Sequence, residues 1–148
     1  MRDNVMISLQ NLLQSLLSEN DISRRLVIED AILDHIEVAL TKYEPRLPKI
    51  VKFGDDMLKI EKKEHLEKLL EWLRGLVRVA SIELQLPRRE GFIVYHKTPF
   101  KKSLIVQSVL IQLLQGGLFG EEATFKLSVD LIEEGRGKGT KGTTSKLI

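Results

Sequence analysis

The stretch Thr98–Gly117, TPFKKSLIVQSVLIQLLQGG, decides how the rest of the chain is arranged. Thr98 can cap the first turn of a helix, and Pro99 at the first helical position gives up no needed hydrogen bond. The two glycines at its end favour helix termination. Residues 103–120 carry no charge, yet the run is shorter than the roughly 20 residues that span a bilayer. We therefore expect a helix covered by protein, either its own sheet and helices or a second subunit.

Composition indicates a globular chain of one domain, because 43% of its 148 residues are hydrophobic and 30% are charged. The sequence has no cysteine, which excludes disulfides, cysteine-type zinc sites and thiol nucleophiles. Many Lys and Glu with few aromatic residues favour a thermophile's protein. The N-terminus has no uninterrupted apolar run, so we predict no signal peptide and a cytoplasmic location.

Charge is distributed unevenly along the chain. Residues 1–41 carry three basic and seven acidic side chains, whereas residues 88–102 carry five basic side chains and one acidic one. Residues 135–148, GRGKGTKGTTSKLI, carry four basic side chains and no acidic one. We expect residues 1–134 to form a single α+β domain and residues 135–148 to form a basic, Gly-rich mobile tail.

Hydrophobic periodicity predicts the elements of the fold. Apolar residues three or four positions apart predict helices over residues 4–18, 22–43 and 62–77, in addition to the helix over residues 98–117. Two short β-prone runs around Gly54-Asp55-Asp56 predict a hairpin over residues 49–60.

Strict alternation of apolar and polar residues predicts two further one-sided strands, over residues 80–86 and 124–131. A third strand is expected over residues 92–97, where both faces carry apolar side chains. The element order is then α-α-β-β-α-β-β-α-β. We therefore predict an α+β fold in which four helices pack mainly on one face of an antiparallel sheet of about five strands.

The sequence offers little for catalysis. Its three histidines, His35, His65 and His96, have no spacing that would gather a metal ion, and no nucleophile elbow, P-loop or dinucleotide-binding fingerprint occurs. Asp55 and Asp56 are better explained by a turn than by a metal site. We predict a protein that is not an enzyme, with no cofactor, no metal and no small-molecule substrate.

The predicted second hairpin is the best candidate binding site. Cations flank an apolar and aromatic strand, and the first hairpin adds further cations and a ring. Single-stranded nucleic acids are bound by cations that neutralise phosphates and by rings that stack on bases at roughly 1–3 kcal/mol each. The candidate residues are Arg88, Arg89, Phe92, Tyr95, Lys97, Lys101 and Lys102, together with Lys52 and Phe53.

Two points stay open at this level. Either Phe92 and Val94 or Ile93 and Tyr95 face outward, and the aromatic residues could instead belong to a sheet that is buried on both sides. Trp72 is expected in the core or in an interface.

The element order and the segment 82–97, IELQLPRREGFIVYHK, resemble ThermoDBP-related archaeal single-stranded DNA-binding proteins. The resemblance implies a helical layer against an antiparallel sheet, with a hydrophobic and basic cleft for single strands. ThermoDBP carries a C-terminal leucine zipper, whereas this chain has GRGKGTKG there, which puts dimerisation through a zipper in doubt.

Two functions of different classes follow. The first is a module that binds single-stranded DNA or RNA with little sequence preference, through a basic and aromatic cleft on the sheet. The alternative is a structural small subunit of a larger nucleoprotein assembly, which would bind nucleic acid weakly and expose a large apolar patch. We expect a homo-oligomer in either case and no membrane partner.

Overall fold

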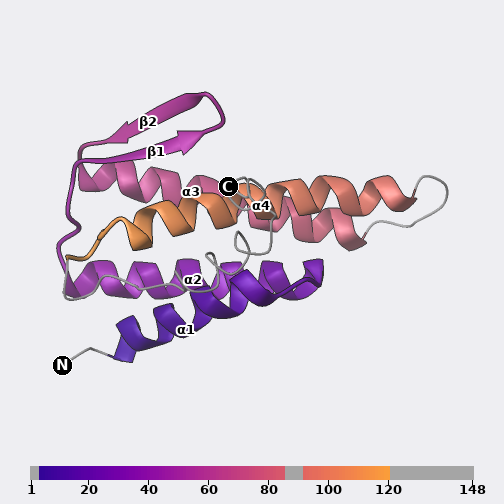
Figure 1. The fold of residues 1–148 in the computed structure, drawn as a ribbon, viewed down its shortest axis with the longest axis horizontal. Coiled ribbons are helices and arrows are strands. Elements are labelled where there is room, and N and C mark those ends of the chain that lie inside the picture. Colours follow the sequence, from indigo (N-terminus) through magenta and orange to yellow (C-terminus); the bar gives the residue numbers. More distant parts are fainter. Residues whose placement is uncertain (1–3, 86–91, 121–148) are drawn as a thin grey trace, which may run out of the picture.

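The computed structural model describes residues 4–85 and 92–120, and for residues 92–96 it describes the backbone alone. Helix α1 (Asn4–Ser18) packs on helix α2 (Ile22–Lys42), as the periodicity predicted (Figure 1). The buried residues of α1 are Met6, Leu9, Leu13 and Leu16, which lie three or four positions apart. Asp21 caps α2 by accepting a hydrogen bond from the backbone N–H of Arg24 at 3.0 Å.

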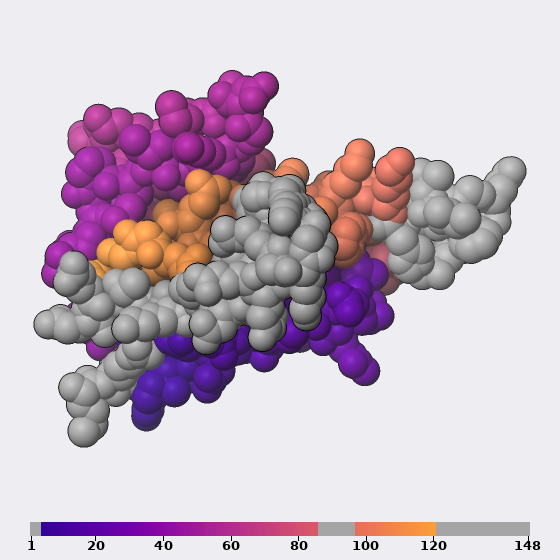
Figure 2. All heavy atoms as spheres, viewed as in Figure 1, coloured from indigo at the N-terminus to yellow at the C-terminus, as the bar shows by residue number. Residues whose placement is uncertain are grey.

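The predicted hairpin is confirmed: β1 (Lys49–Phe53) pairs antiparallel with β2 (Asp56–Ile60). Phe53 lies opposite Asp56, so only two residues form the turn. Gly54 has a φ of 61°, a conformation that glycine adopts without steric cost. Figure 2 shows the hairpin, in magenta, as a raised corner above the helices.

Two long helices complete the described part of the chain. Helix α3 (Lys63–Gln85) packs against helix α4 (Phe92–Gln115), and both contact α2. The core therefore lies between helices, with the hairpin packed on one side. Its largest fully buried side chains are Met6, Leu9, Leu13, Leu16, Ile32, Leu33, Ile36, Ile60, Leu66, Leu73, Leu110 and Leu113.

The prediction of a five-stranded sheet is wrong. In residues 4–85 and 92–120 the sheet has two strands, and four helices make up most of the structure. The predicted order α-α-β-β-α-β-β-α-β fails because residues 80–85 are the end of α3 and residues 92–97 are the start of α4. The predicted strand over residues 124–131 and the predicted tail over residues 135–148 lie outside the described residues.

A continuous helical period explains why residues 80–85 are not a strand. Ala80 and Leu84 alternate with polar neighbours, but they also follow Leu73 and Val77 at intervals of three or four. All four of these side chains are buried or half-buried, whereas Ile82 lies off that face and is 52% exposed. The alternating run is too short to outweigh a helical face that is already established.

Helix α4 also begins earlier than predicted. The expected start at Thr98–Pro99 lies inside the helix, nearly two turns after its first residue, Phe92. Pro99 donates no backbone hydrogen bond there, so the upstream turns form at a cost. The end is as predicted: the helix closes at Gln115, and Gly117 has a φ of 77°.

No helix in the described ranges combines the length and the apolar character needed to cross a membrane.

Candidate interaction site

The two faces of the hairpin have different surroundings. Val51 and Ile60 are buried and Phe53 is half-buried, so this face packs on the helices. The opposite face presents Ile50, Lys52, Met57 and Lys59, all of which are exposed. The cross-strand pairs on that face join one lysine to one apolar residue each: Lys52 to Met57 and Lys59 to Ile50.

A groove of about 800 Å³ lies between β2 and α3. Its walls are mostly apolar, and four exposed or half-buried side chains, Phe53, Met57, Leu58 and Trp72, give it this character together with buried Leu69 and Ile60. Met57 is 66% exposed, Trp72 is 46% exposed and Leu58 is 40% exposed. The lining residues are Phe53, Asp56, Met57, Leu58, Lys59, Ile60, His65, Lys68, Leu69 and Trp72. We call this feature the β2–α3 groove.

An aromatic pair lines the β2–α3 groove. The rings of Phe53 and Trp72 meet edge to face, with their centroids 5.7 Å apart. This geometry is worth about 0.5–1.5 kcal/mol beyond the burial of area, and it fixes the orientation of the indole. Trp72 is the only tryptophan in the chain. A large, oriented and half-exposed ring of this kind is typical of the centre of an interface.

Charged groups at the rim of the groove are mixed in sign but mainly cationic. Lys59 and Lys68 line it together with Asp56 and His65. Lys59 also forms an exposed ion pair with Glu61 at 3.3 Å. The groove thus has an apolar floor and a rim of mixed charge.

The two edges of the hairpin differ. The backbone of Lys52 in β1 donates to Gln112 Oε1 at 2.7 Å and accepts from Gln112 Nε2 at 3.0 Å. The amide of Gln112 on α4 therefore takes the place of a neighbouring strand. No strand of the described chain pairs with the outer edge of β2. That edge, beside the groove, is the open one.

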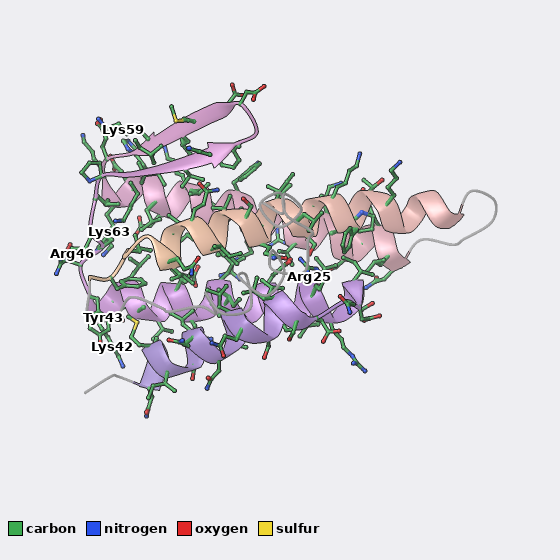
Figure 3. All side chains as sticks on the ribbon, viewed as in Figure 1. Arg25, Lys42, Tyr43, Arg46, Lys59 and Lys63 are labelled. Atoms are coloured by element: carbon green, nitrogen blue, oxygen red, sulfur yellow. The ribbon has the colours of Figure 1, made fainter. Side chains whose placement is uncertain are left out.

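A different site lies at the seam between α2 and α4, where charged and polar side chains are buried. The Arg25 guanidinium donates to Ser103 Oγ at 2.8 Å, to the Glu19 carbonyl at 3.1 Å and to the Gln107 amide oxygen. It also lies over the Phe100 ring, 5.5 Å from the centroid. Arg25 is the labelled residue at the centre of Figure 3.

Glu29 completes the seam and is fully buried. Its Oε2 accepts from Ser103 Oγ at 2.6 Å and lies 3.8 Å from Arg25, while its Oε1 has no hydrogen-bond partner among the described residues. Burial raises the pKa of Glu29 to about 8, an effect that the Ser103 hydrogen bond and the Arg25 charge reduce. Because α1, α2 and α4 enclose this cluster, it serves to align helices.

The sequence-predicted site residues are not brought together. Lys52 and Phe53 lie at the hairpin, whereas exposed Lys97 and Lys101 lie near the start of α4, towards the opposite end of the molecule (Figure 1). Lys102 is bound to the Glu83 carboxylate, with its Nζ 3.2 Å from Oε2.

The remaining predicted residues cannot be placed in a cleft. Phe92 and Tyr95 belong to α4 by their backbone, so the two strand faces on which they were placed do not exist. Arg88 and Arg89 lie outside the described residues. The predicted basic and aromatic cleft on the sheet is therefore wrong in its architecture.

Cations also gather where α2 and α4 end, around the labelled Arg46 and Lys63 (Figure 3). Lys63 Nζ donates to the Leu40 carbonyl at 3.4 Å, and Lys49 Nζ donates to the Gly116 carbonyl at 2.7 Å. The C-terminus of a helix carries partial negative charge, which such cations offset. These contacts give Lys49 and Lys63 a structural role.

The sequence predicted Trp72 only to lie in the core or in an interface, and it did not locate the residue in the groove. It falls one position from Leu73 on α3, and its neighbours Glu71 and Lys68 are exposed. A helical wheel would have located it beside the apolar stripe, at the margin where half-exposed residues occur. Its pairing with Phe53 joins residues far apart in the sequence and needs the fold.

Among residues 4–85 and 92–120, no group of three or more acidic, His or Cys side chains is placed to hold a metal ion. A scan against protein-family models found no match, and searches of curated proteins and of solved structures found none either.

Proposed function

We propose that this protein is a non-enzymatic assembly subunit that docks another protein surface through the β2–α3 groove. The observation that carries the proposal is the joint exposure of Trp72, Met57 and Leu58 over one apolar hollow. Leaving such side chains in water costs about 1.5–3 kcal/mol for each that could be fully buried. A partner that covers the groove recovers this free energy.

The seam between α2 and α4 does not favour an alternative, enzymatic function. Its polar groups, apart from Glu29 Oε1, form hydrogen bonds inside the molecule, and Glu29 is closed to solvent. Titratable groups with shifted pKa values can mark catalytic sites, but a catalytic group must reach a substrate. Glu29 therefore does not support an enzymatic function.

Binding of an apolar dye to the isolated protein tests the proposal. We expect the fluorescence of 1-anilinonaphthalene-8-sulfonate to rise on binding wild type and to fall strongly in Met57→Glu. The matched control is Ile82→Glu, because Ile82 is similarly exposed at 52% but lies outside the groove on α3. Equal dye binding by both variants would contradict a docking role for the groove.

A second candidate function is binding of single-stranded DNA or RNA, as the resemblance to ThermoDBP-related proteins implies. The observation that favours it is the position of Trp72 and Phe53 beside Lys59 and Lys68 in the groove, since rings among cations suit stacked bases and phosphates. Anisotropy of labelled oligonucleotides separates the two functions. Tight binding of single strands that weakens steeply with salt supports this candidate, and weak binding at low salt supports the assembly subunit.

A further inference from the structure

We propose that the partner of the β2–α3 groove is a second copy of this chain, joined by antiparallel pairing of the two open β2 edges. The inference rests on the proposed function, because it names the protein surface that the groove accepts. The argument begins with the direction of the backbone groups in β2.

In an antiparallel pair, one residue of a strand directs its N–H and C=O groups towards the neighbouring strand, and the next residue directs them away from it. The backbone of Lys52 bonds to Gln112 on α4, so it points away from β2. Met57 lies opposite Lys52 and therefore points away from β1, and Lys59, two residues further on, does the same. The open edge of β2 thus offers the backbone groups of Met57 and Lys59.

These two positions restrict how β2 can pair with a copy of itself around a two-fold axis. An outward-pointing residue must face an outward-pointing residue, so Met57 can face Met57, Lys59 can face Lys59, or Met57 can face Lys59 of the other copy. If the two-fold axis passes through Met57, only three residues of each β2 strand lie opposite the other strand. Centring on Lys59 places like charges opposite each other, which is destabilising.

Only the third register overlaps all five residues of β2. The two-fold axis then passes through Leu58, Met57 faces Lys59 of the other copy at both ends, and Asp56 faces Ile60. No like charges face each other within the strand. The strand is therefore self-complementary in hydrogen bonding, with no like charges directly opposite each other, as an isologous interface requires.

The apolar surface beside the open edge of β2 is also consistent with a second copy of the chain as the partner. Leu58 of one copy meets Leu58 of the other at the mouth of the β2–α3 groove, where Trp72 and Met57 are exposed. Pairing gives a four-stranded sheet, and sheets of three or more strands are more stable than an isolated hairpin. It also removes the open edge, which would otherwise pair without selectivity.

Cysteine substitution tests the register in the full chain, which has no cysteine of its own. In the proposed pairing the two Leu58 Cα atoms lie about 4.5 Å apart, within the range of roughly 4.4–6.8 Å seen in disulfides. We expect Leu58→Cys to form a disulfide-linked dimer under mild oxidation. Met57→Cys is the matched control, because the diagonal between the two Met57 residues is about 7–8 Å, too long for a disulfide.

The control is stringent because Met57 is more exposed than Leu58, so random collisions would cross-link Met57→Cys faster than Leu58→Cys. A cross-link that forms equally well in both variants, or better in Met57→Cys, would overturn the proposed pairing.

Proline substitution tests the hydrogen bonds at the edge. Lys59→Pro removes an outward N–H while leaving the bonds to β1, and edge strands tolerate proline. Lys59→Ala is the control, because it removes the same charge and keeps the N–H. We expect Lys59→Pro to raise the dimer dissociation constant about tenfold or more, since two symmetric bonds are lost, and Lys59→Ala to leave it nearly unchanged. Equal dissociation constants in the two variants would overturn the pairing.

Sedimentation equilibrium of the wild-type protein tests the dimer separately from the proposed docking function. A reversible dimer at micromolar concentration supports the pairing. A monomer at every concentration that still binds the apolar dye through the groove overturns the second copy as partner while the docking function stands. A monomer that binds no dye overturns both.

Discussion

The seam between α2 and α4 and the β2–α3 groove distribute their side chains in opposite ways. In the seam, Arg25 and Glu29 are charged residue types that the fold buries, whereas in the groove, Trp72 and Met57 are apolar residues that it exposes. The polar groups of the seam form hydrogen bonds that join α2 to α4 and to the Leu16 carbonyl of α1. The groove lacks an equivalent cover in the described chain. The difference indicates that the seam maintains the fold and that the groove serves an encounter with another molecule.

The largest expected effect on stability is at the seam. Arg25→Ala removes the hydrogen bonds to Ser103, to the Glu19 carbonyl and to Gln107, so we expect the free energy of unfolding to fall by about 3–5 kcal/mol. Arg24→Ala is the matched control, because Arg24 is exposed beside it and should change stability by less than about 0.5 kcal/mol. Denaturant unfolding measures both. A similar loss in the two variants would show that the seam does not hold the helices.

The seam should also make stability depend on pH. The pKa of Glu29 is raised to about 8 in the folded chain, from an ordinary value of 4.5, because burial disfavours the carboxylate. Between these values the folded chain holds a proton that the unfolded chain has released. Stability therefore falls as pH rises from about 4.5 to about 8, by roughly 5 kcal/mol at most.

Glu29→Gln tests this dependence because the amide does not titrate. We expect the variant to lose most of the decline in stability between about pH 5 and about pH 8, measured by urea unfolding at each pH. Glu37→Gln, at an exposed position of the same helix, should keep it. A decline of equal size in Glu29→Gln and wild type would assign the dependence to other groups.

A smaller effect is expected at the covered edge of the hairpin. Gln112→Ala removes both bonds to the Lys52 backbone, so we expect a loss of about 1 kcal/mol. Hydrogen exchange should locate the change, with faster exchange at the Lys52 amide. The exchange rate of the Val51 amide serves as an internal reference, because Val51 lies opposite Leu58 within the hairpin. Unchanged exchange at Lys52 would contradict the role given to Gln112.

A similarly small effect on stability is expected at the groove. Trp72→Ala removes a half-exposed ring and its contact with Phe53, so the monomer should lose only about 1 kcal/mol. Association should suffer more, because interface tryptophans contribute about 2 kcal/mol or more to binding. Unfolding of the dilute protein and sedimentation at high concentration measure the two quantities. A large loss of stability with unchanged association would place Trp72 in the fold and outside the interface.

Local patterns in the sequence predict much of this fold. The helices α1 and α2, the hairpin with its Gly54 turn and most of α3 follow from spacing and turn chemistry. Residues 80–85 could not be assigned in this way, since apolar residues at alternate positions also fit a helical face when a helix precedes them. The start of α4 was misplaced for another reason, because the apolar residues of segment 92–97 fit a buried strand as well as a helix.

The candidate site was predictable only in part. Lys52 and Phe53 were identified from the hairpin, and of the two Phe53 lines the groove, whereas Lys52 lies on the opposite face of the hairpin. The contact of Phe53 with Trp72 depends on how the hairpin packs on α3, which no local pattern encodes. The burial of Arg25 and Glu29 is likewise set by tertiary packing, because both occur in a charged stretch that resembles a solvent-exposed helix face.

Collisional quenching of Trp72 fluorescence by acrylamide tests the central claim most directly, because the chain contains one tryptophan and it lies in the groove. We expect efficient quenching in dilute protein and weaker quenching, with a blue-shifted emission maximum, as the concentration rises into the micromolar range. Lys59→Pro should retain efficient quenching to higher concentrations. Identical quenching and emission across the whole concentration range, with no binding of the apolar dye, would contradict the account of the groove as a docking surface.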